Sequence, residues 1–158
     1  MFKDFIMDDG TLRSKLLDEL YHEALDLSRS IAEYFQCNKI GNIKSVPSDL
    51  MSFYSLECNR MTAGVMQAMS WCLMQKGVRS GEITYEEAAE KHSRLTDNDL
   101  FDNQIGCETE AFPKDFVIYS ERARVLYDRI VRLDRILYDT PTAKGNPVHG
   151  LMDKIEKI

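Results

Sequence analysis

Three histidines and four cysteines are the side chains of this sequence best suited to catalysis or metal binding. Glu19 and His22 form a Glu-x-x-His pair, the spacing that di-iron carboxylate proteins use on the helices of a bundle. Such a site needs a second pair of the same kind, but the residue three positions before His92 is Ala89. We therefore expect His22, His92 and His149 to be solvated and the chain to bind no metal.

The cysteines, at positions 37, 58, 72 and 107, form no Cys-x-x-Cys pair, so their spacing does not fit a zinc ribbon. Cys58 and Cys72 fall in a strongly helical segment, where a free thiol packs as a small apolar group. Reduced cysteines of this kind are typical of a cytoplasmic protein. The chain also lacks phosphate-binding, dinucleotide-binding and nucleophile-elbow motifs. We expect no cofactor and no enzymatic activity.

Length and charge restrict the possible classes of protein further. The chain has 158 residues, 44% of them hydrophobic, and a formal net charge of −6. A chain of this length forms one domain with a sizeable core. No apolar run approaches the ~18 residues of a membrane span, and the acidic N-terminus does not resemble a secretory signal. The acidity argues against a general nucleic-acid binder, since such proteins need cations to displace counterions.

Apolar residues that recur every three or four positions predict three long helices, over residues 11–37, 47–80 and 113–138. Thr11 is the expected N-cap of the first helix, and Gly81 suits the position after the last turn of the second. Thr84 and Glu87 form a capping box that opens a short helix ending near residue 95. Residues 96–110 are expected to be a surface loop. The inner face of the last helix is predicted to comprise Phe116, Ser120, Ala123, Tyr127, Ile130, Leu133 and Leu137.

The fold class that follows is all-α: a three-helix bundle with a long central helix and one short extra helix. We expect the bundle to occupy residues 1–140 and residues 141–158 to form a flexible tail, because Gly145, Pro147 and Gly150 interrupt helix formation there. The tail has one weak apolar stripe that could anchor it in a groove of a partner. Its members are Leu151, Ile155 and Ile158.

The central helix is apolar on every side between Val65 and Met74. A helix with two neighbours should leave one face for water, so another surface must cover this one. A second copy of the chain, packed about a two-fold axis, is the predicted cover. The alternative is that loops and the tail bury the extra face, with the methionines as core filler. The candidate dimer or partner interface comprises Met66, Met69, Trp71, Leu73 and Met74.

Glu57 and Arg60 lie three residues apart on the same helix, on the face that continues into Trp71. They could form an exposed ion pair of little energetic value. Since the face leads into apolar residues, we favour a buried, hydrogen-bonded pair that fixes the register of the helix. Neither arrangement is catalytic.

Four stretches of the central region form a combined pattern: ECNRMT at 57–62, MQ at 66–67, SWCLMQK at 70–76 and GEIT at 81–84. Together they resemble the RcdA family of alphaproteobacterial regulators of CtrA degradation. The resemblance extends more loosely from Leu16 to Tyr138. Ala63 and Gly64 depart from the family pattern, and the tail is not recognisably similar.

The resemblance implies a dimeric three-helix bundle with a mobile tail and no catalytic activity. It further implies an adaptor in cell-cycle proteolysis that helps to present clients, including a response regulator, to the protease ClpXP or its other adaptors. The alternative is a protein-interaction module in developmental signalling with no role in proteolysis. No functional residue is transferred from the family to this chain.

Overall fold

The computed structural model describes residues 6–7, 11–38, 46–90, 94–95, 100–101 and 112–139. Over these residues the chain forms four α-helices and one 3₁₀ helix, with a single isolated β-bridge between Ile6 and Leu12. In chain order the elements are α1 (Ser14–Cys37), η3 (Ser48–Leu50), α2 (Met51–Ser80), α3 (Tyr85–Ala89) and α4 (Lys114–Tyr138). The predicted all-α bundle is confirmed.

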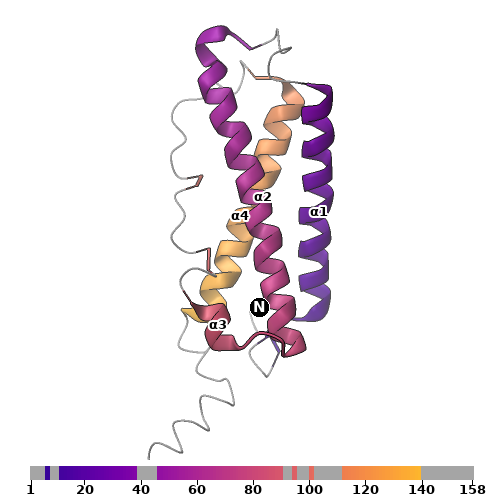
Figure 1. The fold of residues 1–158 in the computed structure, drawn as a ribbon, viewed down its shortest axis with the longest axis vertical. Coiled ribbons are helices and arrows are strands. Elements are labelled where there is room, and N and C mark those ends of the chain that lie inside the picture. Colours follow the sequence, from indigo (N-terminus) through magenta and orange to yellow (C-terminus); the bar gives the residue numbers. More distant parts are fainter. Residues whose placement is uncertain are drawn as a thin grey trace, which may run out of the picture.

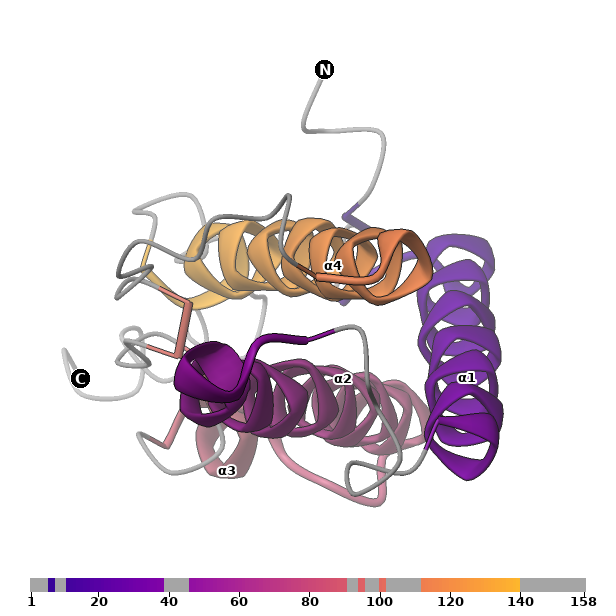
Figure 2. The ribbon, with the colours of Figure 1, turned by 90° about the horizontal axis from the view of Figure 1, so that it is seen from above.

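Helices α1, α2 and α4 run side by side along the long axis of the molecule (Figure 1). Seen from above, α2 and α4 lie next to each other and α1 closes one side of the pair (Figure 2). The short helix α3 follows α2 at one end of the bundle (Figure 1). Each long helix therefore contacts the other two with one face and leaves the opposite face outside the bundle.

The central helix α2 ends at Ser80, where the sequence predicted its end. Gly81 adopts the left-handed conformation, with φ of 80°, directly after the last residue of α2. Four residues later α3 begins at Tyr85, and its capping box is present as predicted. The Glu87 amide donates to Thr84 Oγ1 at 3.2 Å, and the Thr84 amide donates to Glu87 Oε2 at 2.8 Å.

Two predicted helix ends were wrong. Helix α1 begins at Ser14 rather than at Thr11, and its N-cap residue Arg13 makes no side-chain capping bond. Leu12 is drawn into the core instead, where its carbonyl accepts a hydrogen bond of 2.9 Å from Arg79 of α2. Helix α3 ends at Ala89 rather than near residue 95. At the start of α1, a tertiary contact thus overrode the local helix signal.

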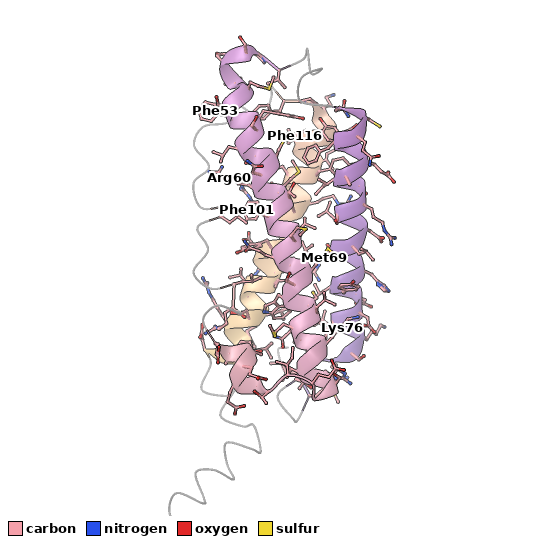
Figure 3. All side chains as sticks on the ribbon, viewed as in Figure 1. Phe53, Arg60, Met69, Lys76, Phe101 and Phe116 are labelled. Atoms are coloured by element: carbon pink, nitrogen blue, oxygen red, sulfur yellow. The ribbon has the colours of Figure 1, made fainter. Side chains whose placement is uncertain are left out.

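The core fills the space between the three long helices. The rings of Tyr54 and Phe116 stack with centroids 4.3 Å apart, which joins α2 to α4. Phe116 is labelled near one end of the bundle in Figure 3. The buried side chains of α1 are Leu17, Leu20, Ala24, Leu27 and Ile31. Those of α4 are Phe116, Ala123, Leu126, Tyr127, Ile130, Asp134 and Leu137. The predicted inner face of α4 omitted Leu126 and Asp134, and two of its members, Ser120 and Leu133, are half-buried, with Leu133 packed against the core.

Several predictions fall on residues that the structure does not describe. They include the tail 141–158 with Leu151, Ile155 and Ile158, most of the loop 96–110, His92 and His149. Within the described residues, no helix is long and apolar enough to cross a membrane.

Candidate functional site

Glu57 of α2 points toward α4 and is almost fully buried. Its carboxylate accepts a hydrogen bond from Ser120 of α4 and lies 3.5 Å from the Arg60 guanidinium. Because one carboxylate contacts both helices, the group fixes α2 against α4 rather than presenting a charge to solvent. The structure thus brings the two candidate residues of the polar pair together, and adds Ser120 as a partner from another helix.

Trp71 is not at an interface. Its side chain is 2% exposed, and its indole Nε1 donates to Asp134 Oδ1 of α4 at 2.9 Å. The prediction that Trp71 faces a partner was wrong, because the side chain is buried within the chain itself and α4 supplies the acceptor for its N–H. Buried tryptophans usually find such a partner.

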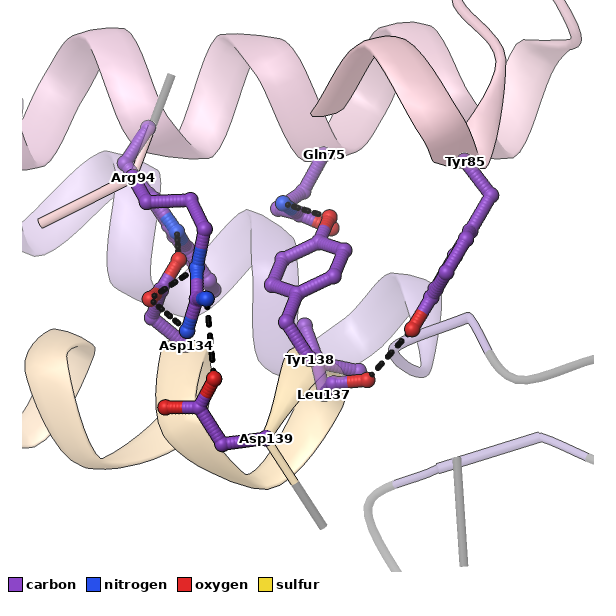
Figure 4. Close-up of polar contacts among 8 residues, drawn as sticks. Gln75, Tyr85, Arg94, Asp134, Leu137, Tyr138 and Asp139 are labelled. Carbon is purple, nitrogen blue, oxygen red and sulfur yellow. Dashed lines mark hydrogen bonds and ion pairs between the residues drawn. The ribbon is translucent and has the colours of Figure 1, made fainter. Parts of the chain in front are cut away.

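Asp134 is the centre of a polar cluster that sequence reasoning missed (Figure 4). Its carboxylate is fully buried, and Oδ2 lies 3.1 Å from both Nε and Nη2 of Arg94. Arg94 also reaches Asp139 Oδ1 at 2.8 Å and lies over the ring of Tyr138. One side chain from the segment after α3 therefore neutralises a buried charge on α4.

Burial raises the pKa of the Asp134 carboxyl above its ordinary value, while Trp71 and Arg94 act in the opposite direction. For the neighbouring Asp139, which is half-exposed, the hydrogen bond to Arg94 holds the pKa below its usual range. The guanidinium of Arg94 is thus the group that makes an ionised carboxylate tolerable inside the bundle.

Further hydrogen bonds extend this cluster toward α3. Gln75 donates to Tyr138 Oη at 2.8 Å, and Tyr85 donates to the Leu137 carbonyl at 2.9 Å (Figure 4). Together they fasten the end of α2, the short helix and the end of α4 to one another. One signal in the sequence could have revealed the cluster: Asp134 follows Ile130 by four residues and precedes Leu137 by three, which places a carboxylate on the inner stripe of its helix.

Gly64, which departs from the family pattern, is contacted by the aromatic ring of Phe101. A Cβ at this position would lie 2.7 Å from Cζ and 2.8 Å from Cε2 of Phe101, closer than real contacts allow. The same ring packs on Tyr127, with centroids 5.2 Å apart, and under the Arg124 guanidinium. Phe101 lies against α2 in Figure 3. The glycine thus makes room for a side chain from the loop region between α3 and α4.

The remaining candidate interface residues differ in exposure. Met66 is 59% exposed and Leu73 is 52% exposed, whereas Met69 and Met74 are half-buried. Leu56, ten residues before Met66 and so about three turns nearer the start of α2, is also exposed. Leu56, Met66 and Leu73 share one outer face of α2 with smaller or polar residues. We call this face the α2 seam; its members are Leu56, Asn59, Ala63, Met66, Ser70 and Leu73.

The described part of the chain offers little for metal or nucleophilic chemistry. No group of three or more His, Cys, Asp or Glu side chains within it could hold a metal ion. His22 is exposed, as predicted. Burial raises the pKa of the Cys58 thiol to about 11 and that of Cys72 to about 12, which keeps both protonated and unreactive.

Comparison with known proteins agrees with this picture of a helical bundle. The family described as "Protein of unknown function (DUF1465)" matches residues 9–158. The chain belongs to the DUF1465 family. The crystal structure of RcdA from Caulobacter crescentus CB15 is similar to this member of the family, with a TM-score of 0.64 and 26% sequence identity. The similarity covers 85% of this chain and 99% of that one, which confirms the predicted resemblance. No curated protein matches the chain.

Proposed function

We propose that this DUF1465 protein is a non-enzymatic cytoplasmic adaptor in cell-cycle proteolysis. In this role it helps to deliver a response-regulator-type client to the ClpXP protease, directly or through another adaptor. The observation that carries the proposal is the similarity to RcdA, a regulator of CtrA degradation, over 85% of the chain. The motifs of the central helix that resemble that family support the same role.

Protein half-lives in the native cell test this role. In a strain that lacks the protein, pulse-chase labelling should show response regulators degraded by ClpXP persisting several-fold longer. Expression of the full chain should restore their half-lives, and a ClpXP substrate that needs no adaptor should be unaffected. Unchanged half-lives would favour the interaction module in developmental signalling.

The same half-life experiment, with full-length variants of the tail, tests whether the tail is needed for this role. We propose that Leu151, Ile155 and Ile158 anchor the tail to a partner. Replacing all three by serine should abolish the restored degradation while the bundle stays folded, as judged by circular dichroism. Full restoration by this variant would remove the tail from the mechanism.

We also propose that the chain forms a homodimer through the α2 seam. Its members follow one another at alternating steps of three and four residues, the spacing of a coiled-coil seam. An antiparallel pair with its two-fold axis between Gly64 and Val65 would place Leu56 opposite Leu73 of the partner subunit. The same axis would set Ala63 opposite Met66 of the partner subunit, so that small faces large. This symmetry supports the seam as a self-complementary surface.

Charge substitutions test the pairing directly. Leu56→Lys and Leu73→Glu should each shift the sedimenting species at micromolar concentration from dimer to the 18.2 kDa monomer. Because the two positions face each other in the pairing, the double variant L56K/L73E should regain the dimer. Val125→Glu, an equally exposed position on α4, is the matched control and should leave the mass unchanged. A monomeric unsubstituted chain, or a double variant that stays monomeric, would contradict the antiparallel seam.

A further inference from the structure

The outer face of α4 exposes two aliphatic side chains that the bundle does not use. Ile118 is 53% exposed and Val125 is 46% exposed. They lie seven residues apart, two helical turns, and so share one face. β-Branched residues are weaker helix formers than most residues that suit exposed helix positions. Neither the core nor helix propensity therefore accounts for their place on the surface.

Arginines continue this face. Arg122 lies between the two aliphatic residues, and Arg129 and Arg132 follow Val125 on the same side of the helix. The steps between these five positions alternate between four and three residues, which gives a second coiled-coil seam. We call it the α4 seam; its members are Ile118, Arg122, Val125, Arg129 and Arg132.

Within the described residues, the polar contacts of Arg129 and Arg132 in the α4 seam are exposed ones. Arg129 Nη1 lies 3.0 Å from Glu23 of α1, and both side chains are more than two-fifths exposed. Arg132 Nε donates to the carbonyl of Asp128 at 3.3 Å. Contacts of this kind contribute little to stability and are readily exchanged for a partner's. Arginine is also the cation that protein interfaces favour, since its planar guanidinium can donate two parallel hydrogen bonds to one carboxylate.

Charge on this face is opposite to that of the whole molecule. The chain carries a formal charge of −6, yet five of its ten arginines fall between residues 122 and 135. The carboxylates Glu121 and Asp128 are exposed beside the seam, so this surface is not uniformly cationic. A surface of alternating aliphatic and cationic positions is complementary to a helix on which aliphatic and acidic residues alternate. It is less complementary to a phosphate backbone or a layer of lipid headgroups.

We propose that the α4 seam is a docking surface for an acidic amphipathic helix of another protein. Aliphatic residues of that helix pack against Ile118 and Val125, and its Asp and Glu side chains pair with Arg122, Arg129 and Arg132. The members of the α4 seam are exposed on the side of α4 opposite its buried residues, and they lie on a different helix from the α2 seam. The docking surface therefore stays available when two copies pair through the α2 seam. The docking surface does not depend on a role in proteolysis.

Site-specific photo-crosslinking in the native cell tests the proposal with the full chain. A photoreactive phenylalanine analogue at position 125 should crosslink to a different protein. Mass spectrometry should map the adduct to a helical segment with alternating acidic and aliphatic residues. The charge reversal R122E/R132E should reduce the adduct at least tenfold. K15E/R29E, which changes the charge equally on the exposed face of α1, should leave the adduct unchanged.

Binding in vitro provides a second readout. A labelled synthetic acidic helix with leucine and glutamate alternating on one face should bind the full chain, and fluorescence anisotropy should show at least tenfold weaker binding to R122E/R132E. The same peptide with lysine in place of glutamate should not bind. Adducts to a second copy of the chain would overturn the proposal. So would tighter binding of duplex DNA or phosphatidylglycerol vesicles than of the acidic helix, or equal adducts from R122E/R132E and K15E/R29E.

Discussion

Replacing Asp134 by alanine is expected to lower the free energy of unfolding by about 3–5 kcal/mol. The substitution leaves the indole N–H of Trp71 without its acceptor and the Arg94 guanidinium without its buried partner. Removing one member of a buried pair costs more than the pair contributes, because the other member stays desolvated. Urea unfolding followed by circular dichroism measures the change.

The control is Asp128→Ala, an exposed carboxylate on the same helix, which should change stability by less than about 0.5 kcal/mol. A double-mutant cycle with Arg94→Ala isolates the pair. Since both single variants remove the same interaction, the double variant should cost less than their sum by about 1–3 kcal/mol. Additive losses would show that Asp134 and Arg94 do not stabilise each other, despite their distance of 3.1 Å.

Adding a methyl group at Gly64 is expected to have opposite effects in two backgrounds. In the unsubstituted chain, Gly64→Ala should destabilise by about 1–2 kcal/mol, because its Cβ would meet the ring of Phe101 at 2.7 Å and displace it. In a Phe101→Ala background the clash is gone. The same substitution should then stabilise by up to about 1 kcal/mol, since alanine is the better helix former.

Equilibrium unfolding of the four chains in this cycle gives the sign in each background. Thr62→Ala, on the exposed side of the same helix two residues earlier, should change stability by the same amount with and without Phe101. A stabilising Gly64→Ala in the unsubstituted chain would show that the ring is not held against α2.

Local sequence signals determined where most helices lie and which sides of them face inward. Apolar residues of α1 recur at steps of three and four, and Leu20, Ala24, Leu27 and Ile31 of that stripe are buried, whereas its first member, Leu16, is half-buried beside the buried Leu17. Gly81 and the Thr84–Glu87 capping box marked the end of α2 and the start of α3. These features act over one or two turns of backbone, so the neighbouring residues alone decide them.

Only the tertiary structure decided what covers each apolar face. Between Val65 and Met74 the surface of α2 is apolar all round, and nothing in its own sequence distinguishes Trp71, which bonds to Asp134 of α4, from Met66 and Leu73, which face outward. The acceptor for the indole, Asp134, lies 63 residues away along the chain. Arg94, which neutralises the Asp134 carboxylate, comes from a third segment. A helical wheel reports which residues share a face, but the partner of that face depends on how distant helices pack, and that is set by contacts with no local signature.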